Sequence, residues 1–243
     1  MFGLFGDRVK QWITLNEPWV IATAGYGSGV MAPGKYNQKY RAAHNVILAH
    51  SAAYRMYNSK YKDSQQGVIG ISLSSGFIEG TMPSNAENWQ SSWNALEFEL
   101  GWFAEPIFGS GDYPTEMKER LSNSSLPRNF LPEFTEKEKI DNPGSDFFGL
   151  NHYSTSLSSV GDTVEGFITT GCDTWPGSGS SWLKQVPWGF RKILRYIKRR
   201  YGNPLVYVTE NGVSNRTGTD VNLQVCIIIF NLSFFIYFGY NIS

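Results

Sequence analysis

Cysteine, histidine and net charge are all scarce in this 243-residue chain. The two cysteines are too few for a disulfide framework. The three histidines have no metal-ligand spacing with another histidine, cysteine or carboxylate, so the sequence predicts no metal site and no cofactor. The 21 basic and 21 acidic residues cancel, which argues against nucleic acid as a partner.

A signal peptide is also missing from the start of the sequence. The first residues lack a basic segment followed by a long apolar stretch before the charges at Asp7 and Arg8. As written, the chain is therefore expected in the cytoplasm, while a secreted or membrane-bound parent protein would place it in the secretory pathway. The localisation stays open between these two.

Aromatic residues are abundant at 15% of the chain, with 8 Trp, 13 Tyr and 16 Phe. One interpretation is a large hydrophobic core. The other is that some of these rings line a sugar site, where apolar sugar faces stack on them and a few polar groups fix the orientation.

Strand-like and helix-like segments alternate along the chain. Short apolar runs predict strands, and apolar residues at helical spacing predict helices. The expected strands are 10–16, 67–73, 146–153 and 205–208, and the expected helices are 40–61, 87–103, 114–121, 135–140 and 188–201. Residues 154–179 are rich in Ser, Thr and Gly and are expected to form a long surface excursion. This order predicts an α/β fold with a parallel sheet; a doubly wound sheet would show a Gly-rich phosphate loop, so a section of a (β/α)8 barrel fits better.

The segment 223–240 differs from the rest of the chain because it is almost entirely apolar. A spanning helix needs roughly 20 predominantly apolar residues, and this run is slightly short and is interrupted by polar residues. Its β-branched and aromatic residues also suit a buried strand or an aggregation-prone end. Membrane association through 223–240 is therefore conceivable but is not the favoured interpretation.

Two glutamates lie at the ends of predicted strands. Glu17 follows the strand 10–16, and Glu210 follows the strand 205–208. Barrel enzymes place catalytic groups at the carboxyl ends of their strands, and two carboxylates are the minimum needed to hydrolyse a glycosidic bond. An asparagine adjoins each acid, and its amide can both donate to and accept from sugar hydroxyls.

The residues around both acids make a family resemblance specific. The segments FGDRVKQWITLNEP (5–18) and VYVTENG (206–212) resemble the two catalytic signatures of glycoside hydrolase family 1, the β-glucosidase and lactase family. Further similar segments are GYGSG with APG (25–34), FAEPIF with GDYP (103–114), LPEFTEKEK (131–139), SDFFGLNHY (145–153) and VPWGFRKIL (186–194). The resemblance covers about residues 2–214 and is strongest to the animal lactase-like and cytosolic β-glucosidase branch.

The resemblance implies a (β/α)8 barrel and hydrolysis of β-glucosides or β-galactosides by a retaining double displacement. It implies that Glu17 is the general acid/base and Glu210 the nucleophile. It also implies that Asn16 binds the sugar 2-hydroxyl, that Tyr153 orients the nucleophile and that Asn151 lies beside them in the pocket. His152 is expected to pack rather than react, and either Trp175 or Trp182 could contact the aglycone.

The chain also departs from the family pattern at both ends. The family's first three barrel strands precede Phe5, and a last strand with a Trp-rich segment follows Gly212. We therefore expect about strands 4 to 7 of the barrel, in a partial catalytic domain at 1–214 with a divergent tail at 215–243. Such a sheet leaves two open edges and an uncovered interior. Two functions stay open: a retaining β-glycosidase of which this is a piece, or an inactive truncated form with a binding or membrane-associated role.

Overall fold

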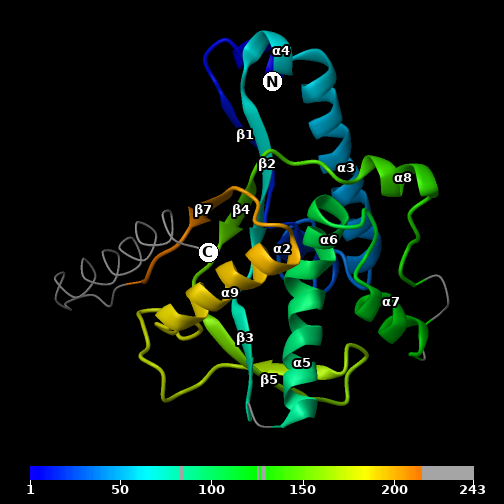
Figure 1. The fold of residues 1–243 in the computed structure, drawn as a ribbon. Coiled ribbons are helices and arrows are strands. Elements are labelled where there is room, and N and C mark those ends of the chain that lie inside the picture. Colours follow the sequence, from blue (N-terminus) through cyan, green and yellow to red (C-terminus); the bar gives the residue numbers. More distant parts are fainter. Residues whose placement is uncertain (83–84, 125, 127–129, 215–243) are drawn as a thin grey trace, which may run out of the picture.

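A four-stranded parallel sheet lies at the centre of the molecule (Figure 1). The computed structural model describes residues 1–82, 85–124, 126 and 130–214. The sheet has the order β1-β2-β4-β7, which is also the order of these strands along the chain. Its strands are β1 (Gln11–Asn16), β2 (Val68–Ser74), β4 (Phe148–Asn151) and β7 (Val206–Glu210).

All four strands lie within or close to the segments predicted from sequence, and all three pairings between them are parallel. Parallel neighbours need long crossover connections, which helices provide here. The helices are α1 (Phe2–Phe5), α2 (Pro18–Val20), α3 (Lys39–Lys60), α4 (Lys62–Gln65), α5 (Ala86–Leu96), α6 (Trp102–Phe108), α7 (Thr115–Ser122), α8 (Glu136–Asp141) and α9 (Pro187–Arg200). Two π-helical segments, Ile21–Gly25 and Glu97–Gly101, complete them.

Helix α8 begins at a capping box formed by Thr135 and Glu138, at the start of the helix predicted over 135–140. The Thr135 hydroxyl accepts from the Glu138 backbone N–H at 3.3 Å, and the Glu138 carboxylate accepts from the Thr135 N–H at 2.8 Å. Each contact satisfies a backbone donor that the first turn of a helix leaves without a partner. The short sequence pattern alone therefore places this helix start.

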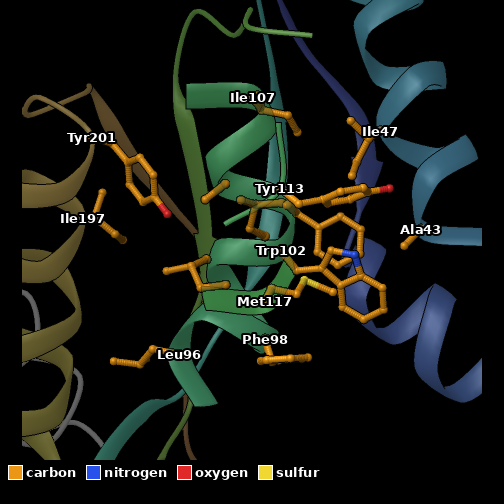
Figure 2. Packing of buried hydrophobic residues seen from close by; sticks show 14 of the residues in the cluster. Ala43, Ile47, Leu96, Phe98, Trp102, Ile107, Tyr113, Met117, Ile197 and Tyr201 are labelled. Atoms are coloured by element: carbon orange, nitrogen blue, oxygen red, sulfur yellow. The ribbon is translucent and has the colours of Figure 1, made fainter. Parts of the chain in front are cut away.

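The core lies between the sheet and the helices α3, α6 and α9 (Figure 2). Trp102 and Phe103 are among the largest fully buried side chains. Ile47, Met117 and Ile197 belong to the same hydrophobic cluster. The outward side chains of β2 and β4 complete this cluster from the sheet side: Ile71, Leu73, Phe148 and Leu150. This packing holds the strands, and so the residues at their ends, in place.

The predicted helix 87–103 is one helical run in three parts. The π-helical segment Glu97–Gly101 joins α5 to α6. A π turn takes more residues than an α turn, so residues beyond it rotate relative to those before it. The buried face of α5 passes through Asn88, Ser92 and Ala95, so Trp89 lies on its outer side and is 60% exposed. Helix α6 is buried on all sides, and Trp102 is 1% exposed.

The surface excursion expected at 154–179 contains regular structure in its first half, which the sequence did not predict. Strands β5 (Thr155–Val160) and β6 (Phe167–Thr170) form an antiparallel pair there, and β5 pairs with β3 (Phe77–Gly80). The Thr and Ser side chains suggested a loop, but β-branched residues and Ser at alternating positions also form a strand when a partner strand is present. That partner is about 80 residues earlier in the chain, where a local pattern does not reveal it.

The sheet has two outer strands, β1 and β7, and within the described residues neither pairs on its outer side. This agrees with the expected open edges of a barrel section. None of the helices in the described part of the chain is both long and apolar enough to cross a membrane. The predictions for the tail segment 223–240 fall outside the described residues.

Two buried histidines are expected to make the free energy of unfolding depend on pH. His50 lies between the Thr14 hydroxyl and the Gly144 carbonyl, at 2.6 and 2.8 Å, and burial lowers its pKa to about 4. Burial likewise lowers the pKa of His152 to about 4. The unfolded chain binds these protons near pH 6.5, so acidification from pH 7 stabilises the unfolded state until the folded histidines also titrate near pH 4.

We therefore expect the free energy of unfolding of the wild type to fall more between pH 7 and pH 5 than that of His50→Gln, by about 2 kcal/mol. The raised pKa of Glu99, described below, acts in the opposite direction in both proteins and so cancels in this difference. Urea unfolding at both pH values measures it. Parallel pH profiles of the two proteins would contradict the prediction.

Candidate active site

Glu17 lies directly after β1, where the backbone turns sharply. Its φ of 49° and ψ of 60° lie in the left-handed region, which is uncommon for a residue with a side chain. Its backbone N–H donates to the Ser72 carbonyl at 2.9 Å, and Pro18 then begins α2. Such backbone strain of roughly 1–3 kcal/mol persists only where surrounding contacts hold it, and it commonly marks functional sites.

Glu210 is the last residue of β7 and is held by Tyr153. The Tyr153 hydroxyl donates to the Glu210 carboxylate at 2.8 Å. Burial, that hydrogen bond and the negative charges of Glu210 and Glu17 raise the pKa of Tyr153 to about 12. The phenol therefore keeps its proton at neutral pH and serves as a permanent donor to Glu210.

Asn151, at the end of β4, connects the two halves of the site. Its amide nitrogen donates to the Glu17 carboxylate at 2.9 Å and to the Asn16 side-chain oxygen at 3.0 Å. Its amide oxygen accepts from the hydroxyls of Ser72 and Thr209 at 2.7 and 2.6 Å. Two hydroxyl donors on one side and two oxygen acceptors on the other leave one orientation of the amide that satisfies every partner.

The strand register explains why these residues meet. Asn16 is aligned with Ser72 across β1 and β2, and Asn151 is aligned with Glu210 across β4 and β7. Parallel strands present their carboxyl ends at one edge of the sheet. The two acids, 193 positions apart in the sequence, therefore face the same space.

His152 packs as expected and supports the site from behind. Its ring stacks on Phe190 at 4.9 Å between centroids, and its Nδ1–H donates to the Ser75 carbonyl at 2.9 Å. Its backbone N–H donates to the carbonyl of Glu210 at 2.9 Å, and the Asn211 amide donates to the carbonyl of His152 at 2.5 Å. These contacts fix the end of β7 against the end of β4.

A cavity of about 1230 Å³ opens above these strand ends. Glu17, Glu210, Asn151 and Tyr153 line it, so four of the five site residues predicted from sequence share one cavity. Asn16 is not part of its lining and reaches the site through Asn151. Among the described residues, no group of three His, Cys, Asp or Glu side chains lies close enough together to hold a metal ion.

The wall of the cavity beyond the acids carries both apolar and charged side chains. Trp182 lines it and packs edge to face with Tyr153 at 5.9 Å between ring centroids. Trp175 does not line it and packs against Trp188 instead. Of the two tryptophans considered from sequence, Trp182 is thus the one placed to contact a bound molecule.

A third carboxyl group, that of Glu99, also lines the cavity. It accepts from the Gly76 backbone N–H at 2.9 Å, and burial raises its pKa to about 7. Glu99 comes from the π-helical segment before α6. It can therefore hold or release a proton near neutral pH at the wall of the cavity.

Sequence reasoning missed Ser72, Thr209 and Glu99. Ser72 and Thr209 are polar residues at inward positions of otherwise apolar strands, a signal that the sequence does contain. Glu99 has no local signal, because its position in the cavity depends on the π-helical turn. Together the site holds two carboxylates in a hydrogen-bonded frame, an arrangement suited to acid–base and nucleophilic chemistry at one carbon centre.

Comparisons with known proteins agree with this geometry. The sequence pattern of "Glycosyl hydrolase family 1" matches residues 1–225. Human lactase/phlorizin hydrolase is 47% identical over 240 residues, covering 91% of this chain and 12% of that protein. Human cytosolic β-glucosidase is 37% identical over 228 residues, covering 87% of this chain and 48% of that protein. The chain thus spans less than half the length of these two relatives.

Solved structures show the same fold. The aphid myrosinase superposes with a TM-score of 0.90 at 32% identity, covering 98% of this chain and 55% of that one. The rice Os3BGlu6 β-glucosidase, in a covalent complex with glucose, superposes with a TM-score of 0.85 at 34% identity, covering 96% of this chain and 55% of that one. These enzymes are (β/α)8 barrels, and the parallel sheet seen here is a section of that barrel. Pattern, relatives and fold agree, and the chain belongs to glycosyl hydrolase family 1.

Proposed function

We propose that the protein containing this chain hydrolyses small β-glycosides with retention of configuration at the anomeric carbon. The observation that carries this proposal is the pair Glu17 and Glu210 at the ends of two parallel strands, both lining one cavity. Asn151 holds the first acid and Tyr153 holds the second, at 2.9 and 2.8 Å. In retaining enzymes of this kind one carboxylate attacks while the other transfers the proton.

In the proposed reaction Glu210 attacks the anomeric carbon and forms a glycosyl-enzyme, while Glu17 protonates the leaving oxygen. Glu17 then takes a proton from a water molecule as that water attacks the anomeric carbon, which breaks the bond to Glu210, releases the sugar and restores both carboxyl groups. Tyr153 supports this role because its neutral hydroxyl points at the Glu210 carboxylate and fixes the attacking oxygen.

Two asparagines are proposed to bind and position the sugar. Asn16 would bind the 2-hydroxyl, a contact that strengthens in the transition state. Asn151 donates to both the Asn16 oxygen and the Glu17 carboxylate, so it sets the distance between the sugar-binding group and the proton donor. Because Asn151 is held by two hydroxyls on its other side, both contacts are arranged before a substrate arrives.

The substrate class follows from the relatives. The printed names of the two human relatives are a lactase/phlorizin hydrolase and a β-glucosidase. We therefore propose β-glucosides or β-galactosides as substrates, bound with the aglycone towards Trp182. We propose residues 1–214 as the catalytic part, with 215–243 as a divergent tail. We propose that no nucleic acid is a partner, and membrane association through 223–240 is not the favoured interpretation.

The open sheet bears on the activity of the 243-residue chain by itself. Remote contacts to the substrate supply much of the energy that orients and distorts it for reaction. With β1 and β7 as outer strands within the described residues, one side of the cavity has no strand to supply such contacts. We therefore expect the isolated chain to hydrolyse substrate several orders of magnitude more slowly than a closed barrel.

The test compares hydrolysis of an aryl β-glucoside by two proteins. One is the purified chain; the other is a chimera in which residues 1–214 replace the matching part of human cytosolic β-glucosidase. We expect hydrolysis by the chimera, with β-glucose as the first product in nuclear magnetic resonance spectra, and little or none by the chain. A folded chimera that is inactive, or that first releases α-glucose, would contradict the proposal.

A further inference from the structure

The wall of the active-site cavity carries one carboxyl group that the proposed reaction does not use, that of Glu99. The side chain is partly buried, and its Oε1 accepts from the Gly76 backbone N–H at 2.9 Å. A carboxylate can accept about four hydrogen bonds, so most of this capacity is left for a molecule in the cavity. Among the described residues, no cationic side chain forms an ion pair with Glu99.

The strand register places Glu99 farther out from the sheet than the two catalytic acids. Asn16 is aligned with Ser72, and the next residue, Glu17, donates its backbone N–H to the Ser72 carbonyl at 2.9 Å. Gly76, which holds Glu99, comes four positions after Ser72 (76 − 72), and a rise of about 3.3 Å per residue puts it at most about 13 Å farther along. An aglycone that extends outward from the anomeric carbon therefore reaches the level of Glu99.

The same cavity offers apolar surface for an aromatic aglycone. Trp19, Ile78 and Trp182 line it together with Glu99. A ligand site of this kind binds through its apolar wall, and a few polar groups fix the orientation of the ligand. Because a carboxylate only accepts hydrogen bonds, the complementary group on the ligand is a donor, and a charged ammonium group is the strongest of these.

We propose that Glu99 binds the aglycone and selects substrates whose aglycone carries an ammonium group, an inference that rests on the proposed function. The preferred substrates are then β-glycosides of arylalkylamines. The ring packs in the apolar part of the cavity, and the ammonium group pairs with Glu99. Glu99 takes no part in the proton transfer at the leaving oxygen, so it determines which substrate binds and leaves the bond cleavage to the two acids.

This selectivity is expected to depend on pH. Burial raises the pKa of Glu99 to about 7, so its carboxyl group is mostly neutral at pH 6 and mostly charged at pH 8. His152, which bonds the Ser75 carbonyl, has a pKa lowered to about 4, and Tyr153 has a pKa raised to about 12, so both stay uncharged over this range. An alkylammonium ligand, like a lysine side chain, stays charged. The preference for it should rise with pH.

Other ionisable groups near Glu99 act equally on charged and neutral forms of the protein or face elsewhere. Glu97 and Glu105 lie 3.7 and 2.8 Å from Arg200, and Glu116 accepts from the Trp93 indole at 3.2 Å, all outside the cavity lining. The ionisable groups that share the lining with Glu99 and Tyr153 are Glu17, Glu210, Asp173 and Lys184. Variants that each remove one carboxylate charge separate these groups from Glu99.

The test compares two glucosides of equal size, 4-(2-aminoethyl)phenyl and 4-propylphenyl β-glucoside. Isothermal titration calorimetry measures their dissociation constants for the full 243-residue chain at pH 6 and pH 8. At pH 8 we expect the ammonium compound to bind roughly tenfold more tightly than the propyl compound, and at pH 6 this ratio should fall by roughly fivefold. Glu99→Gln keeps the size of the side chain but removes its charge, and it should bring the ratio close to one at both pH values.

The matched control is Asp173→Asn, which removes a carboxylate that lines the same cavity but whose side chain is fully exposed. It should keep the wild-type ratio. Far-UV circular dichroism of each variant verifies its fold, and the pH dependence of the wild type tests the proposal without any variant.

Three results would overturn the proposal. The first is a wild-type ratio close to one at pH 8, or no binding of the ammonium compound. The second is a ratio that is the same at pH 6 and pH 8. The third is a ratio that Asp173→Asn abolishes and Glu99→Gln does not, which would assign the ammonium group to Asp173.

Hydrolysis by the chimera with human cytosolic β-glucosidase separates this inference from the proposed function. A higher kcat/KM for the ammonium compound, lost in Glu99→Gln, would support both. Hydrolysis of the two compounds with equal kcat/KM would support the proposed function and overturn the role of Glu99. Tighter binding of the ammonium compound that depends on Glu99, without hydrolysis of either compound, would support the role of Glu99 and contradict the proposed function.

Discussion

Replacing Glu210 with alanine is expected to lower the rate of β-glucoside hydrolysis by roughly 10⁴-fold or more in a closed barrel that contains this chain. The loss is large because, in the proposed reaction, Glu210 forms the covalent bond to the sugar. Tyr153 would lose the acceptor of its 2.8 Å hydrogen bond but could not replace it as a nucleophile, since a phenol is protonated at neutral pH even with an ordinary pKa of about 10.

The stereochemistry of rescue by azide separates the roles of the two acids. With Glu210→Ala and an activated glucosyl substrate, azide can enter the space left by the carboxylate and displace the leaving group once. One displacement inverts the anomeric carbon, so the product is the α-glucosyl azide. With Glu17→Ala the glycosyl-enzyme on Glu210 still forms, and azide then attacks it from the other face. Two displacements give the β-glucosyl azide.

The chimera with human cytosolic β-glucosidase is the protein to use for this experiment. Nuclear magnetic resonance coupling at the anomeric proton distinguishes the two azides. The same azide from both variants, or the two products exchanged between them, would show that the roles of Glu17 and Glu210 are wrongly assigned. Thr163→Ala, a change outside the cavity, is the control and should retain wild-type activity.

The sheet was predictable from sequence because each strand is a short apolar run bounded by turn residues. Burial on both faces produces such runs in the central strands β2 and β4, whereas the outer strands β1 and β7 are only partly buried. The positions of Glu17 and Glu210 followed for the same reason, since each acid comes directly after such a run. The family resemblance then supplied the roles that spacing alone does not determine.

Long-range contacts explain what sequence reasoning missed. The hydroxyls of Ser72 and Thr209 meet the Asn151 amide only after three strands have aligned, so no local window contains that network. Strand β5 needed its distant partner β3 to be recognised. The turn at Glu97–Gly101 changes which face of a helix is apolar, and a calculation that assumes 3.6 residues per turn continues past it on the wrong face.

The second large effect concerns the stability of the core around Trp102, in helix α6. Replacing Trp102 with alanine is expected to lower the free energy of unfolding by roughly 3–5 kcal/mol, because it opens a cavity in the centre of the core. Trp102 packs against Tyr40 and Phe103 at 5.0 and 5.2 Å between ring centroids (Figure 2 shows its place beside Ala43 and Met117). Urea unfolding of the 243-residue chain, followed by far-UV circular dichroism, measures the change.

Trp89→Ala is the matched control, since it removes the same side chain from the same helical run. Trp89 is 60% exposed and stacks on Trp93 at 6.2 Å between ring centroids, so its loss should cost roughly 0.5–1.5 kcal/mol. Equal losses, or a larger loss for Trp89→Ala, would contradict the position of Trp102 at the centre of the core.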